Sequence, residues 1–133
     1  MIQISNLSKH YGKLAAVDNL NLQVAPGEIF GFLGPNGAGK TTTIRCMMGI
    51  LKATSGQVLL DGHDIVGDAQ KAKAISGFIP DRPFIYEKLS GREFLNFVGK
   101  LHRVDSAQLS KRIAELLEHL ELTPWQDELV ESY

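Results

Sequence analysis

Residues 28–43 read EIFGFLGPNGAGKTTT, and this stretch decides the fold of the chain. Its apolar run, Ile29–Leu33, has the length of a buried strand and is too short for a buried helix. Gly34–Gly39 then holds three glycines in six residues, which lets the backbone turn sharply and point its N–H groups inward. A helix is expected to begin near Gly39. The stretch therefore predicts a strand, a tight loop and a helix, in that order.

The loop has the chemistry of a phosphate site. A concave set of backbone amides binds anions, and the start of a helix adds the positive end of its dipole. Lys40 brings a positive charge suited to the outer phosphates of a nucleotide, and the Thr41 hydroxyl is placed to ligate Mg²⁺. A flexible glycine-rich linker would require neither a strand before it nor a helix after it. The residues predicted to bind the nucleotide are Gly34, Pro35, Asn36, Gly37, Ala38, Gly39, Lys40 and Thr41.

The composition is typical of a globular protein. The chain has 133 residues, of which 44% are hydrophobic and 22% charged, enough for one domain with its own core. A net charge of −1 argues against a basic surface built for nucleic acid. The one cysteine, Cys46, lies among apolar neighbours, which predicts a buried thiol in a reducing compartment. No stretch approaches the roughly 18 apolar residues of a membrane span, so another chain is expected to cross any membrane involved.

Strands and short turns are expected around the loop. Met1–Ser5 and Val17–Val24 alternate in hydrophobicity, the second with a slip near Asp18-Asn19, and both predict strands of an antiparallel sheet that leads into a parallel core. Lys40–Leu51 has helical spacing, weakened near its end by Gly49. The segments that follow predict a turn at Thr54–Gly56, a strand at Gln57–Leu60, a short helix at Ala69–Ala74 and a buried strand at Ile75–Ile79.

The last third of the chain is predicted to be helical. Ser90 and Glu93 have the spacing of a capping box, in which each side chain bonds the other residue's backbone N–H. Asp105 or Ser106 opens a second helix with an apolar stripe, and Thr123 is expected to cap a third. The stripes are those of a helical core.

The sequence resembles the nucleotide-binding domain of ABC transporters over its whole length. The matching segments are LSKHYG (7–12), VDNL (17–20), PGEI (26–29), GPNGAGKTT (34–42), TSG (54–56) and DGHDI (61–65). The segment GFLGPNGAGKTTT (31–43) looks most like bacterial exporters of the ABC-2 type, whose ATPase is a separate polypeptide.

The resemblance implies the fold class. We expect an α/β phosphate-loop NTPase fold of the ABC type, with an N-terminal antiparallel β subdomain, the Walker A strand and helix, and the start of the helical subdomain. The C-terminal part of the core sheet is expected to be absent. Residues 1–133 would form a partial nucleotide-binding domain, with the β subdomain and loop at about 1–85 and the helical subdomain at about 86–133.

The resemblance also implies further site residues. Tyr11 falls where the family places an aromatic ring that stacks on adenine; the residues alone leave open that it packs within a hairpin. Thr42 matches a position that binds the inner phosphates. Asp81 sits where the family usually has Gln, and because Asp is one carbon shorter, a water-mediated contact with Mg²⁺ is expected. The implied cofactors are ATP and Mg²⁺.

Other family parts are not matched in these residues. The signature motif, the Walker B strand, the catalytic Glu and the switch His have no counterpart among them. Val58–Asp61 has the form of a Walker B strand but is followed by a Gly-His turn, and Leu89–Glu93, which is similar to a signature, caps a helix. We therefore interpret the chain as an N-terminal fragment that is inactive alone, and we expect it to be a truncated reading frame, a deliberately shortened protein or a gene remnant.

The resemblance implies an ATP-binding subunit that couples hydrolysis to transport by a membrane permease on another chain. Such subunits dimerise and sit on the cytoplasmic face of the membrane, and the permease sets the substrate. A binding-only module that holds ATP without turnover is the alternative. An unrelated phosphate-loop kinase is less favoured, because the residues after the loop match transporter sequences.

Overall fold

The computed structural model describes residues 1–133, which form two compact units, Met1–Ile79 and Pro80–Tyr133. The first unit contains β1 (Ile2–Tyr11), β2 (Leu14–Val24), α1 (Lys40–Met47), β3 (Ser55–Leu60), β4 (His63–Asp64) and α2 (Ala69–Ala74). The second contains α3 (Gly91–Leu101), α4 (Ser106–His119) and two 3₁₀ turns, η1 (Thr123–Trp125) and η2 (Val130–Ser132). The short helix expected at Ala69–Ala74 is confirmed at those bounds.

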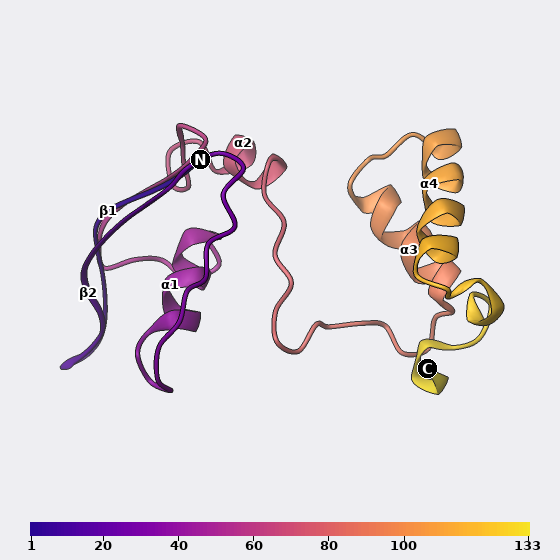
Figure 1. The fold of residues 1–133 in the computed structure, drawn as a ribbon, viewed down its shortest axis with the longest axis horizontal. Helices are drawn as coiled ribbons and strands as arrows, with labels where there is room; N and C mark the ends of the chain where they lie inside the picture. Colours follow the sequence, from indigo (N-terminus) through magenta and orange to yellow (C-terminus); the bar gives the residue numbers. More distant parts are fainter. The chain divides into compact units, whose positions relative to one another are not determined.

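The first unit is built on a four-stranded sheet in the order β2-β1-β3-β4, in which every neighbouring pair is antiparallel. β1 and β2 form a long hairpin (Figure 1), which turns at Gly12 with a φ of +59°. The predicted antiparallel sheet is confirmed, but the parallel core expected to follow it is not formed, because no two strands pair in parallel. The slip expected in β2 is also present: Asn19 has a φ of +49°, and the register with β1 shifts beside it.

A bulge in β1 brings the core residues to one face. Ile4 and Leu7 are both buried although they are three residues apart, a spacing that puts side chains on opposite faces of a regular strand. Asn6, with a φ of +49°, supplies the extra residue and restores the common face. Gly56 of β3 lies against this bulge, where a β-carbon would overlap the Asn6 carbonyl oxygen. The turn predicted at Thr54–Gly56 is therefore wrong, because Gly56 is already part of a strand.

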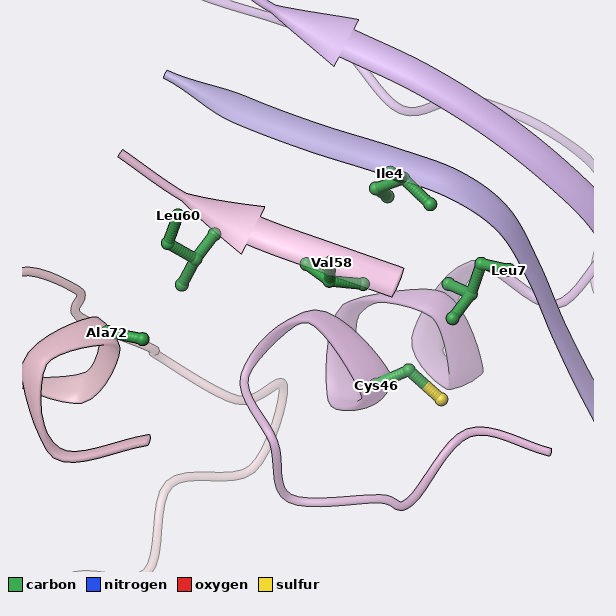
Figure 2. Close-up of a cluster of buried hydrophobic side chains, with 6 residues drawn as sticks. All are labelled: Ile4, Leu7, Cys46, Val58, Leu60 and Ala72. Carbon is green, nitrogen blue, oxygen red and sulfur yellow. The ribbon is translucent and has the colours of Figure 1, made fainter. Parts of the chain in front are cut away.

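Helix α1 packs on the sheet through Cys46. Figure 2 shows Cys46 beneath Leu7 and Val58, and all three side chains are almost completely buried. The predicted buried thiol is confirmed. Burial raises the pKa of Cys46, which the nearby positive charge of Lys9 partly opposes, so the thiol stays protonated at neutral pH. The helix ends at Met47 and does not reach Leu51 as predicted.

The predicted strands at Ile29–Leu33 and Ile75–Ile79 are not formed. Ile29, Leu33 and Ile79 have exposed fractions of 101%, 92% and 89%. A strand requires a hydrogen-bonded neighbour, and none of the four strands pairs with either segment. Parts of both segments instead line an open apolar groove of about 550 Å³ beside the sheet. The residues along it include Phe30, Phe32, Ile75, Phe78, Leu22 and Leu60.

The second unit is held together by its helix caps and by one apolar seam. The predicted capping box is confirmed: Ser90 Oγ accepts from Glu93 N at 3.2 Å, and Glu93 Oε2 accepts from Ser90 N at 2.8 Å. Asp105 caps α4 by accepting from two backbone N–H groups. The buried stripe of α4 consists of Leu109, Ile113 and Leu117.

The predicted third helix is wrong. Thr123 begins a single 3₁₀ turn, and its side chain caps nothing; Leu122 occupies the cap position. Pro124 at the start of the turn fits a first-turn position, but the segment stops after Trp125. Across the whole chain, none of the helices is both long and apolar enough to span a membrane.

Candidate functional site

The loop between Gly34 and Gly39 runs directly into α1 and is pressed against β2. Gly39 is the N-cap residue, and its φ of +82° lies in the left-handed region that glycine adopts most readily. A β-carbon on Gly39 would overlap the Ala16 carbonyl oxygen and lie 3.2 Å from Val17 Cγ2. Ala16 is the unpaired residue of a bulge, because Ala15 and Val17 pair with adjacent residues of β1. Glycine is needed here for both conformation and space.

The first turn of α1 presents free amides. Within the loop, Ala38 N donates to Pro35 O at 3.2 Å, and Thr43 N donates to Gly39 O at 2.8 Å. The backbone N–H groups of Lys40, Thr41 and Thr42 have no acceptor in the protein, and no acidic side chain lies in this turn. Free N–H groups and the helix dipole together favour an anion at this point.

The Lys40 ammonium group lies inside the loop that it follows. Its Nζ donates to the carbonyl oxygens of Gly34 at 2.6 Å and Pro35 at 2.7 Å. An ammonium group has three donors, so one remains for a phosphate oxygen. The Thr41 hydroxyl makes no hydrogen bond to the protein and is exposed. The donor set of amides, ammonium and hydroxyl fits a phosphate chain with a hard cation such as Mg²⁺.

Tyr11 lies on the same hairpin that the loop contacts. It is the last residue of β1 and pairs with Leu14, two residues before Ala16. Half of its surface is exposed (50%), and Lys9 Nζ lies over its ring, 5.1 Å from the ring centre. The half-exposed ring can accept a ligand, and its stacking role stays a prediction.

Asp81 belongs to the second unit, where it is exposed and forms no ion pair. Its role toward Mg²⁺ stays a prediction. No group of three His, Cys, Asp or Glu side chains in the chain could hold a metal ion by itself. Thr41 is the residue of this loop whose exposed hydroxyl could ligate a metal beside the oxygens of a nucleotide.

Two contacts at the site were not anticipated from the sequence. The packing of Gly39 on Ala16 had no signal, because it depends on a bulge whose position the residue pattern does not mark. The placement of Lys9 beside Tyr11 did have a signal, since residues two apart in a strand share a face.

The family model described as ABC transporter matches residues 17–133 of this chain. The chain belongs to the ABC transporter family. This confirms the resemblance inferred from the loop and its flanking segments.

Curated members of the ABC transporter family are similar over the whole chain. The linearmycin resistance ATP-binding protein LnrL of Bacillus subtilis (strain 168) is 37% identical over 133 residues, which cover 100% of this chain and 43% of that protein. The daunorubicin resistance ATP-binding protein DrrA3 of Streptomyces coeruleorubidus is 36% identical, covering 99% of this chain and 42% of that protein. The chain thus spans about two fifths of the length of these relatives.

Solved structures of ABC proteins share the fold. An ATP-binding subunit of an ABC transporter superimposes with a TM-score of 0.84 at 24% identity, covering 96% of this chain and 53% of that chain. A dimeric ATP-binding cassette in a post-hydrolysis state, bound to ADP and Pi, gives a TM-score of 0.82 at 23% identity, covering 100% of this chain and 63% of that chain. The α/β fold class expected from the sequence is confirmed.

Proposed function

We propose that this chain binds ATP with Mg²⁺ at residues 34–42 and forms the nucleotide-binding part of an exporter ATPase of the ABC-2 type. The observation that supports the proposal most is the first turn of α1. This turn presents three free backbone N–H groups, the Lys40 ammonium and the Thr41 hydroxyl. No acidic side chain lies in it to repel an anion. The similarity to LnrL and DrrA3, both named as ATP-binding proteins, supports the same conclusion.

The chain's own residues divide the work of holding the phosphates. The free N–H groups of α1 can donate to phosphate oxygens without any rearrangement, because the helix fixes their direction. Lys40 adds one charge-assisted hydrogen bond while its other two donors keep the loop closed on itself. Thr41 is the residue that would hold Mg²⁺, which neutralises phosphate charge when it is bound. The Thr42 hydroxyl is proposed to contact the inner phosphates.

The proposal includes partners and location. We infer that the chain acts beside a membrane permease on another polypeptide, on the cytoplasmic face of the membrane, and within a dimer of nucleotide-binding domains. The first unit, Met1–Ile79, would bind the nucleotide, and the second would begin the helical subdomain. The dimeric cassette among the structural neighbours supports the dimer.

Replacing Lys40 tests the proposal. We expect Lys40→Ala to weaken Mg-ATP binding by about tenfold to a hundredfold, which corresponds to the loss of one hydrogen bond to a charged group. Isothermal titration calorimetry of both proteins measures the difference. Lys13→Ala is the matched control, because Lys13 is an exposed lysine of the β1–β2 turn. Equal affinity in wild type and Lys40→Ala would contradict the proposed site.

Replacing Tyr11 tests base recognition separately. If the ring stacks on the base without hydrogen-bond readout, Tyr11→Ala should weaken ATP and GTP binding alike, by about fivefold to a hundredfold. Tyr11→Trp should retain both affinities, since a larger aromatic ring still offers a face. Competition titrations with the two nucleotides give the comparison. An unchanged affinity in Tyr11→Ala would assign the ring to hairpin packing.

A further inference from the structure

The strand that ends in Tyr11 carries a second residue with an unusual set of contacts. Lys9 Nζ lies 5.1 Å from the centre of the Tyr11 ring, within the range of a cation–π interaction. The same Nζ donates to the carbonyl oxygen of Lys52 at 2.8 Å. The Lys9 ammonium group is therefore held by a backbone carbonyl oxygen while it covers one face of the Tyr11 ring.

The segment that holds Lys9 in place belongs to the connection between α1 and β3. Besides the bond from Lys9 to Lys52, Thr54 N donates to Ser8 O at 2.9 Å, and His10 N donates to Thr54 Oγ1 at 3.0 Å. The three residues of β1 directly before Tyr11, at positions 8–10, are thus bound to Lys52 and Thr54. This connection follows α1, the helix whose first turn we propose as the phosphate site, so α1 lies between the loop and the residues that hold Lys9.

We propose that Lys9 is a positioning residue for base recognition: it covers one face of the Tyr11 ring, orients the ring and directs a purine to the opposite face. The inference rests on the proposed function, because it assigns a role within the same nucleotide site. A cation on one face of an aromatic ring draws π electron density toward itself, which favours an electron-rich purine on the other face. Lys9 would then act through Tyr11, without touching the phosphates.

The test compares a ligand that has a base with one that lacks it. In the wild-type protein, Mg-ATP and Mg-tripolyphosphate are titrated in parallel by calorimetry, and each titration is repeated with Lys9→Met and Lys9→Arg. We expect Lys9→Met to lose roughly threefold to tenfold in affinity for Mg-ATP and nothing for Mg-tripolyphosphate. Lys9→Arg keeps a cation and a donor, and should stay within about twofold of wild type for both ligands.

Lys13→Met is the matched control, since it removes an exposed lysine four residues away on the same hairpin. It should change neither affinity. The proposal is overturned if Lys9→Met binds Mg-ATP with wild-type affinity. It is also overturned if the affinities for both ligands fall equally, because Lys9 would then act in phosphate binding or in folding. Failure of the proposed nucleotide site would give a different result. The wild type would then bind neither ligand, or its affinities for both ligands would equal those of Lys40→Ala.

Discussion

The 133 residues alone should release no measurable phosphate from ATP, even at concentrations where they bind it. Hydrolysis requires an oriented water and stabilisation of the charge that develops in the transition state, as well as a phosphate site. Lys40 and Thr41 belong to the phosphate site that we propose. No acidic side chain lies in the first turn of α1, where the phosphates would bind. In other phosphoryl-transfer enzymes, removing one group that positions the water or stabilises charge lowers the rate by about 10³–10⁵. Removing several such groups lowers the rate further.

The measurement is phosphate release by the purified chain under saturating Mg-ATP. Lys40→Ala, purified in the same way, measures contamination by other ATPases. We expect the two rates to agree within error. Steady turnover in the wild type that disappears in Lys40→Ala would show that these residues form a more complete site than we infer.

Gly39→Ala should be strongly destabilising, by about 2–5 kcal/mol. About 1–2 kcal/mol of this comes from placing a side chain in the left-handed region, at a φ of +82°. A further 1–3 kcal/mol or so comes from overpacking, because the new methyl group would overlap the Ala16 carbonyl oxygen, which is backbone and cannot rotate away. Relieving the overlap separates the loop from β2, so nucleotide binding should fall as well.

Gly37→Ala separates the two causes. Gly37 has nearly the same φ, +83°, but a β-carbon there would meet no atom within 4 Å. It should therefore cost only the conformational part, about 1–2 kcal/mol. Urea unfolding followed by circular dichroism gives both free energies. If the two variants were equally stable, the contact between the loop and β2 would have no energetic weight.

The sequence predicted best those elements whose signals are local. Ser90 and Glu93 form their capping box, and Ala69–Ala74 is a helix, because a few adjacent side chains determine each. The strand predictions at Ile29–Leu33 and Ile75–Ile79 failed because a strand depends on residues far away in the sequence. Their apolar runs have the right length, but pairing depends on a neighbouring strand, and the sheet of these residues provides none.

The candidate site divides in the same way. The spacing predicted the loop glycines, Lys40 and Thr41 as phosphate-binding residues; the structure has the loop and the helix in that order, and the binding role stays a prediction. The packing of Gly39 on Ala16 could not be predicted from spacing, since it depends on a bulge formed between residues from two parts of the chain. Asp81 belongs to the second unit, and its predicted role is untested.

The contact between Gly39 and Ala16 also has a consequence for cooperativity. The loop rests on the bulge of β2, which pairs with the strand that ends in Tyr11, so we expect opening of the β1–β2 hairpin to free the loop. A nucleotide that contacts both Tyr11 and the loop would bind only when the hairpin and the loop are both folded. Its binding would therefore stabilise the N-terminal unit against local unfolding. Segments 20 or more residues apart in sequence would then melt as one.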